Sequence, residues 1–160
     1  MIGKKILHTL LVCGGLVIST VSMAADEGPH DKQIQARQSI FKLFSYHIGI
    51  LGAMAKGEME YNAELATEAA KNLEATSKLG QSTLWPPGSD NGNPENAKTR
   101  ALPAIWETFP DIVDKAADLE KATTALAAVA GDGVDAIRAN IGDVGASCKA
   151  CHDDFRAKKK

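Results

Sequence analysis

Aromatic residues are scarce in this chain of 160 residues, at 5% of the total. Strands favour aromatic and β-branched side chains, whereas alanine, which is abundant after residue 50, favours helices. The composition therefore argues against a sheet, and the sequence contains four helical segments and no convincing strand. The formal net charge of −2 is too small to indicate a nucleic-acid partner.

Long apolar runs are also missing, except at the N-terminus. Lys4 and Lys5 precede a mostly apolar run over residues 6–21, and residues 22–24 (SMA) end it with the small side chains of a cleavage site. The run is short for a membrane span, and no stop-transfer segment follows. We therefore expect residues 1–24 to be a signal peptide cleaved after Ala24, and residues 25–160 to be one exported domain, most simply in a bacterial periplasm. The alternative is an uncleaved anchor.

Cysteine is rare as well, with three in the whole chain. Cys13 lies inside the signal, and the bulky Val12 before it argues against a lipid anchor. Only Cys148 and Cys151 remain after cleavage. An oxidising compartment permits a disulfide between them, but a two-residue spacer closes a very small loop and would stabilise the fold little.

The helices can be placed from their apolar patterns and end signals. The first is expected over residues 31–56, ending at Gly57, and the second over residues 63–79, with Asn62 as its N-cap and Gly80 as its stop. The predicted inward stripe of the first helix is Ile34, Phe41, Phe44, Ile48 and Leu51, together with Arg37 and Gln38. The second helix presents a face of small residues, namely Ala66, Ala69, Ala70, Leu73 and Ser77.

A loop rich in Pro, Gly and Asn (residues 86–96) interrupts the pattern and predicts a long crossover rather than a domain boundary. A short helical turn is expected over residues 103–108, and a third long helix reaches about Ala130. Its apolar or small positions recur at spacings of four and three, which is typical of a bundle: Ile112, Ala116, Leu119, Thr123, Leu126 and Ala130. The GDG turn at residues 131–133 then forces an antiparallel fourth helix. The predicted fold is all-α, an antiparallel up-down-up-down four-helix bundle.

The fourth helix carries both cysteines on its inward side. Its predicted core positions alternate by three and four residues: Val134, Ile137, Ile141, Val144, Cys148, Cys151 and Phe155. His152 lies four residues after Cys148 and therefore on nearly the same face. The Cys-x-x-Cys-His triplet is thus expected to point into the bundle.

Three chemistries use such a triplet. Structural zinc needs four ligands, which would require His30 or His47 to join. A thioredoxin-type dithiol belongs at the start of a helix, where the dipole lowers a thiol pKa, and this motif is at a helix end. The third is covalent haem c, because two thiols one turn apart can each bond a porphyrin vinyl group while the following His152 reaches the iron. Export and the inward placement favour haem c, one per chain.

The sixth iron position then decides the function. His30, His47, Met54 and Met59 are the candidate donors, but none falls on the centre of the first helix's stripe, and His47 reads as a surface or flank residue. We expect an open position covered by Phe41, whose apolar ring gives bound O₂ no hydrogen bond. Such a pocket would select NO or CO.

Three charged or polar residues could contact the haem. Arg37 and Gln38 lie one turn before Phe41 on a buried face, and a buried arginine calls for an anion such as a haem propionate. Arg37 could instead extend to solvent. Arg156, four residues after His152, either lies beside the proximal face or belongs to the solvated C-terminal tail.

At these residues the chain resembles cytochrome c′, the class II c-type cytochromes. The matching segments are RQSIF (37–41), TRALPAIW (99–106) and GASCKACHDDFR (145–156). The resemblance implies that Cys148 and Cys151 form the thioethers and His152 is the single axial ligand. It further implies propionate contacts from Arg37, Gln38 and Thr99, the distal cover from Phe41, a proximal basic role for Arg156, and a homodimer through the first two helices.

The expected function is a periplasmic five-coordinate, high-spin haem protein that binds NO or CO and takes part in NO handling or in electron transfer with a periplasmic redox partner. The alternative is a low-spin, six-coordinate electron carrier with a methionine or histidine as sixth ligand. An enzyme such as a peroxidase would need distal acid–base residues, and none shares the face of Phe41.

Overall fold

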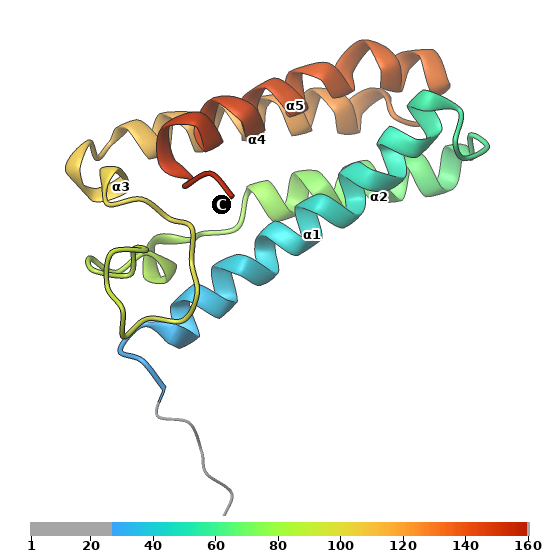
Figure 1. The fold of residues 1–160 in the computed structure, drawn as a ribbon. Coiled ribbons are helices and arrows are strands. Elements are labelled where there is room, and N and C mark those ends of the chain that lie inside the picture. The colour runs from blue at the N-terminus through green and yellow to red at the C-terminus, as the bar shows by residue number, and fades with distance from the viewer. Residues whose placement is uncertain (1–26, 160) are drawn as a thin grey trace, which may run out of the picture.

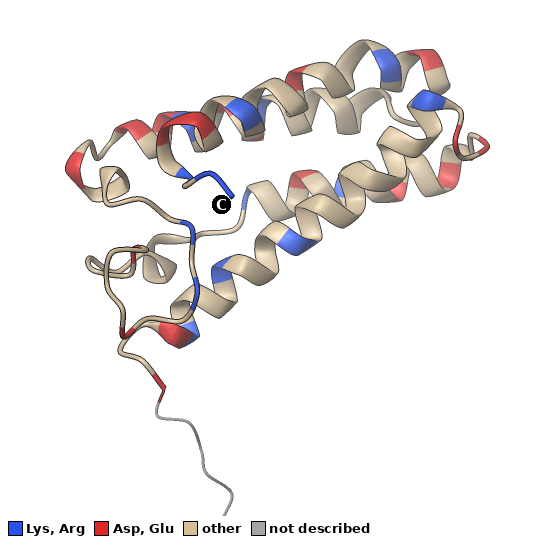
Figure 2. Ribbon diagram, in the orientation of Figure 1, with Lys and Arg blue, Asp and Glu red and all other residues tan. Residues whose placement is uncertain are grey.

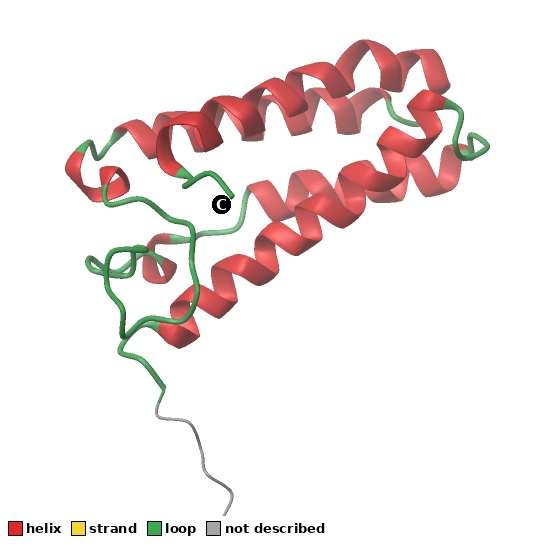
Figure 3. Cartoon of the chain, viewed as in Figure 1, coloured by secondary structure: helices red, strands yellow, loops and turns green. Residues whose placement is uncertain are grey.

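Four long helices and two short ones form the fold in the computed structural model, which describes residues 27–159 (Figure 1). They are α1 (Asp31–Lys56), α2 (Ala63–Ser77), the 3₁₀ turn η1 (Ser82–Leu84), α3 (Ala104–Glu107), α4 (Asp111–Val129) and α5 (Val134–Phe155). No strand occurs within these residues, which are otherwise loops and turns (Figure 3). The all-α bundle is therefore confirmed, whereas the expected signal peptide lies outside the described residues.

The helix ends follow from capping chemistry. Gly57 adopts the left-handed conformation, with φ 77°, and its backbone N–H closes the last turn of α1. The side chain of Asn62 accepts a hydrogen bond of 2.8 Å from Leu65 N and so begins α2, as predicted. Helix α2 ends at Ser77, two residues before the predicted end, because Lys78 already serves as its cap.

The main core joins α1, α2, α4 and α5. It is built from buried side chains of modest size, including Leu51, Met54, Ala66, Ala69, Ala70, Leu73, Leu126, Ile137 and Val144. The alanines of α2 let its neighbours approach closely, as the sequence pattern indicated. Three positions differ from expectation: Ala116 and Phe41 are exposed, whereas Met54, placed off the inward stripe by periodicity, is only 1% exposed.

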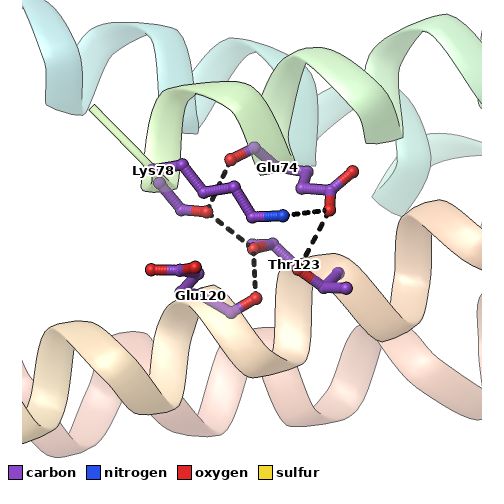
Figure 4. A network of polar contacts seen from close by, with 6 residues as sticks. Glu74, Lys78, Glu120 and Thr123 are labelled. Atoms are coloured by element: carbon purple, nitrogen blue, oxygen red, sulfur yellow. Dashed lines mark hydrogen bonds and ion pairs between the residues drawn. The ribbon is translucent and has the colours of Figure 1, made fainter.

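A polar contact within this core fixes α2 against α4 (Figure 4). Thr123 is fully buried, and its hydroxyl lies 2.8 Å from that of Ser77. At the surface of the same contact, Glu74 accepts hydrogen bonds from Lys78 and Thr124. Each hydroxyl also lies close to a backbone carbonyl of its own helix, Ser77 Oγ 2.7 Å from Glu74 O and Thr123 Oγ1 3.0 Å from Glu120 O, so the pair adds a polar link between two helices.

The crossover loop packs against the C-terminal end of α5. Ala101 and Arg156 form an isolated antiparallel bridge, in which Leu102 N donates to Phe155 O over 3.0 Å and Ala157 N donates to Arg100 O over 2.8 Å. Ala101, Ile105 and Phe155 then form a second, smaller core cluster. This arrangement brings the loop residues next to the Cys-x-x-Cys-His triplet.

Helices α1 and α5 run antiparallel, and they diverge toward the end that holds the N-terminus of α1 (Figure 1). At the opposite end, Arg138 Nε donates to Ala55 O over 2.7 Å. His152 lies fourteen residues after Arg138, and Phe41 fourteen residues before Ala55. At 1.5 Å per residue, both lie about 21 Å along their helices from this contact. Phe41 and His152 are therefore at the same level of the bundle.

None of the helices in residues 27–159 is long and apolar enough to span a membrane.

Candidate haem site

The two cysteines lie half-buried on the inward side of α5, one turn apart. Both are free thiols. Burial raises the pKa of each thiol above its ordinary value, and for Cys151 the neighbouring Cys148 raises it further. A redox dithiol needs the opposite shift, since the thiolate is the reactive form. The arrangement thus presents two adjacent protonated thiols that face the bundle and form no disulfide.

His152 is half-buried on the same side of α5. Burial, and then the positive charges of Arg156 and Arg100, lower the pKa of His152 below its ordinary value. The imidazole is consequently neutral at pH 7, which is the form that binds a metal ion. The same side chain lines a pocket of about 310 Å³ with Arg100, Asp153, Arg156 and Lys158.

Arg100 is a site residue that the sequence patterns did not identify. Its guanidinium donates to Ala157 O through Nε over 2.7 Å, and this contact holds it beside the C-terminal end of α5. Arg156, expected either beside the proximal face or in a solvated tail, is exposed but lies in the pocket with His152. Two arginines therefore raise the positive potential on this side of His152.

Phe41 lies on α1, at the end of the bundle that holds His152. Its ring centroid lies 6.1 Å from that of Phe44 and 6.3 Å from that of Trp85, and the side chain is 40% exposed. The neighbours of Phe41 are thus aromatic, but the side chain is more exposed than its predicted place on the inward stripe implied. Trp85 is a second residue that the sequence patterns missed; its only signal was its position just before the Pro-rich loop.

Arg37 is the buried charged residue of this region, at 2% exposure. Its guanidinium donates to Ser89 Oγ over 2.7 Å, to Ser89 O, to Leu84 O over 3.3 Å and to Thr99 Oγ1 over 3.1 Å. It also lies 4.4 Å from the centre of the Trp85 ring. Burial lowers the pKa of Arg37 to about 10, although Asp90 partly opposes this shift.

Within residues 27–159 the hydrogen-bond partners of Arg37 are uncharged, and its contact with a haem propionate stays a prediction. Neutral oxygens and an aromatic face hold the guanidinium, because the loop wraps closely around it. The alternative, an arginine extended to solvent, is wrong. Arg37 therefore ties the crossover loop to α1.

Gln38 and Thr99 lie on either side of this contact. Gln38 Nε2 donates to Lys98 O over 2.7 Å. Thr99 Oγ1 accepts from Arg37 and, over 3.2 Å, from Ala101 N, so its own hydroxyl proton remains for a further acceptor. The structure brings Arg37, Gln38 and Thr99 together, about one helical turn from Phe41.

The four candidate sixth ligands all lie at other levels. Met54 is adjacent to Ala55, and therefore about 20 Å along the bundle from His152. Met59 lies in the loop after α1 at that same far end, and His30 precedes α1. His47 is six residues, or about 9 Å, beyond Phe41. It is half-buried rather than a surface residue, and its Nδ1 is buried without a hydrogen-bond partner in the described chain.

The donor set fits a covalently attached haem. The free thiols, the neutral His152 and the half-exposure of these side chains suit a flat group that lies between α1 and α5. Zinc would need more ligands, and residues 27–159 contain no group of three or more His, Cys, Asp or Glu side chains placed to hold a metal ion. Fold and site together define a helical-bundle protein of the c-type haem class.

Comparison with known proteins agrees with this class. The family model described as cytochrome C′ matches residues 32–156. The chain is 36% identical over 156 residues to a cytochrome c′ of Cereibacter sphaeroides, covering 98% of this chain and 99% of the relative. It is also 38% identical over 128 residues to a cytochrome c-554 of Cereibacter sphaeroides, covering 80% and 95%. The chain belongs to the cytochrome c′ family, whose cofactor is covalently bound haem c.

Solved structures show the same fold. One is a nitric oxide complex of a mutant cytochrome c prime from Alcaligenes xylosoxidans, with a TM-score of 0.69 and 32% identity, covering 80% of this chain and 95% of that one. Another is a cytochrome c′ with a ligand-controlled dimer dissociation, with a TM-score of 0.72 and 34% identity, covering 79% and 95%.

Proposed function

We propose that this chain is a periplasmic haem protein whose iron is five-coordinate and high-spin and binds NO and CO. The observation that carries the proposal is the pairing of His152 with Phe41. The two lie at one level of the bundle on facing helices, whereas His30, Met54 and Met59 lie far from that level. An apolar ring rather than a donor atom therefore covers the position opposite the axial histidine.

Each residue has a distinct proposed role. Cys148 and Cys151 would form the two thioethers, and their spacing of one helical turn matches two vinyl groups on one porphyrin edge. His152 would be the only protein ligand of the iron. The bound haem would supply an iron with one open position, which a diatomic gas can occupy.

The neighbours of that position would select among gases. Phe41 and its neighbour Phe44 present apolar rings there and carry no hydrogen-bond donor. Bound O₂ carries partial negative charge and gains from such a donor, whereas NO and CO need it much less. The proposed selectivity therefore favours NO and CO over O₂ and over anions.

Polar residues would contact the propionates and the proximal side of the haem. Arg37, Gln38 and Thr99 are proposed to contact the propionates, supported by the unused hydroxyl proton of Thr99 and by the charge that Arg37 keeps in a buried setting. On the other side of the ring, Arg156 is proposed as the proximal basic residue for NO, and Arg100 adds to the same positive field.

The remaining proposals concern export, enzymatic activity, oligomeric state and the gas ligand. Residues 1–24 are proposed as a cleaved signal and residues 25–160 as the haem domain in the periplasm. The protein is proposed to bind and transfer rather than to act as an enzyme, because aromatic side chains instead of acid–base groups surround Phe41. The dimeric relative supports a homodimer through α1 and α2, and the nitric oxide complex supports NO as ligand.

An optical titration of the purified holoprotein tests the proposal. The ferrous protein should show a high-spin spectrum without added gas, and it should bind NO and CO but not O₂. A low-spin ferrous spectrum before any gas is added would refute the open position and favour the six-coordinate electron carrier, with His47 as the ligand to examine.

A further inference from the structure

Two neighbouring apolar side chains are exposed where α3 meets α4. Phe109 is 66% exposed and Val113, four residues later, is 49% exposed. Scattered single apolar residues are normal on a surface, but two at one corner form a small contiguous patch. Together with Glu107, Asp111 and Asp114 they define what we call the α3–α4 tip.

The tip is surrounded by negative charge. Glu107, Asp111 and Asp114 are all exposed, and none takes part in an ion pair within the described chain. The neighbouring Lys115 does not compensate them, because its Nζ lies 3.4 Å from Asp154 on α5. Acidic segments are accordingly concentrated where α3 and α4 meet (Figure 2). The apolar patch therefore has three uncompensated carboxylates around it.

Helix stability explains only part of this charge. Asp111 and Asp114 lie in the first turn of α4, where the helix dipole favours acidic residues. Glu107, however, is the last residue of α3 and gains nothing from that dipole. The dipole also gives no reason to expose Phe109 and Val113, so the combination calls for another explanation.

The tip lies next to one of the two haem-attachment residues. Cys151 packs against the small core cluster of Ala101, Ile105 and Phe155, and Ile112 packs against the same cluster. Ile112 stands between Asp111 and Val113 in the chain. A haem bonded to Cys151 would thus be separated from the exposed α3–α4 tip only by the small core cluster and Ile112.

We propose that the α3–α4 tip is the docking surface for a one-electron redox protein that presents basic residues around an apolar centre. The proposal rests on the haem function proposed above. One electron leaves the ferrous iron, which becomes ferric, and the partner's ferric centre becomes ferrous; no bond forms or breaks. The carboxylates attract the partner, and Phe109 and Val113 supply the dry centre of the contact.

Stopped-flow kinetics test this surface. Ferrous holoprotein is mixed with a ferric, lysine-rich class I cytochrome c as the probe, at a series of ionic strengths. The tip variant is Glu107→Gln/Asp111→Asn/Asp114→Asn. The matched control is Glu58→Gln/Glu60→Gln/Glu64→Gln, which removes three exposed, unpaired carboxylates at the other end of the bundle. Both variants change the net charge equally.

The tip variant should react roughly 5- to 10-fold more slowly at low ionic strength, and its rate should depend less on salt, whereas the control should stay within about twofold of wild type. Phe109→Ser should slow the reaction with the salt dependence retained. Equal slowing of the two triple variants, or no slowing of the tip variant, would overturn the proposal, because net charge alone would then govern the encounter.

A second measurement does not depend on the variants. Amide resonances of the wild-type ferrous, CO-bound holoprotein should shift at residues 107–109 and 111–115 when the ferrous form of the same probe is added, and shifts confined to another face would refute the docking site. The optical spectrum of the ferrous holoprotein, recorded before CO is added, reports separately on the proposed function. A low-spin iron in that CO-free spectrum would refute the open position and leave the kinetic comparison valid.

Discussion

Replacing Arg37 by methionine is expected to loosen the crossover loop from α1. The variant Arg37→Met keeps an unbranched side chain that can pack against Trp85, but it removes every hydrogen bond of the guanidinium. Two of these bonds end on Ser89, which is fully buried, so the Oγ and O atoms of Ser89 would lose their donor with no access to water.

The magnitude follows from these two acceptors. A hydrogen bond from a charged donor contributes about 1.5–3 kcal/mol, and a buried acceptor left without a partner costs a similar amount. Part of this loss is offset, because the lowered pKa of Arg37 shows that burial already disfavours its charged form. We therefore expect Arg37→Met to lower the free energy of unfolding by about 2–4 kcal/mol.

Urea unfolding of the holoprotein, followed by circular dichroism at 222 nm, measures this loss. Lys42→Met is the matched control: the Lys42 side chain is exposed and forms no ion pair within residues 27–159, so we expect a change below about 0.5 kcal/mol. In a double-mutant cycle with Ser89→Ala, the coupling energy should be about 1–2 kcal/mol. A loss for Arg37→Met no larger than that for Lys42→Met would refute the anchoring role of Arg37.

Four further changes probe the cover, the loop and the helix contacts. Phe41→Ala should speed CO binding by roughly tenfold in stopped flow if the ring shields the iron, and unchanged rates would remove it from that role. Trp85→Leu should accelerate CO binding less, because it only frees the ring of Phe41 to move, and a larger effect than that of Phe41→Ala would contradict this order. Thr123→Val should lower the free energy of unfolding by about 1–2 kcal/mol through loss of the buried hydroxyl contact, which thermal denaturation can check. Hydrogen bonds from Lys78 and Thr124 hold the pKa of Glu74 below its ordinary value, so the stability difference between wild type and Glu74→Gln should be present above about pH 4.5 and vanish as the pH falls further; a difference that persists in acid would refute the contact.

The long helices could be predicted because the ends and the inward face of each helix depend on the residues of that helix. The bounds of α1 and the caps at Gly57 and Asn62 follow from local patterns. The inward line through Val144, Cys148 and Phe155 follows from spacing alone. Met54 was misplaced for a physical reason: near the end of α1, neighbours on two sides bury a wider arc of the helix than one stripe describes.

Residues brought in by the loop could not be predicted in the same way. Trp85, Ser89 and Arg100 lie in irregular backbone, where no period assigns a direction to a side chain. Their contacts with Arg37 and with the end of α5 depend on tertiary packing of the crossover. The sequence could therefore indicate that Arg37 is buried, but it could not show which acceptors hold the guanidinium.

Resonance Raman spectroscopy of the ferrous holoprotein tests the open position opposite His152 most directly. With no exogenous ligand present, we expect an iron–histidine stretching band, which only a five-coordinate, high-spin ferrous iron displays. Absence of that band together with low-spin marker bands would contradict the open position, because a second protein donor would then occupy the place assigned to Phe41.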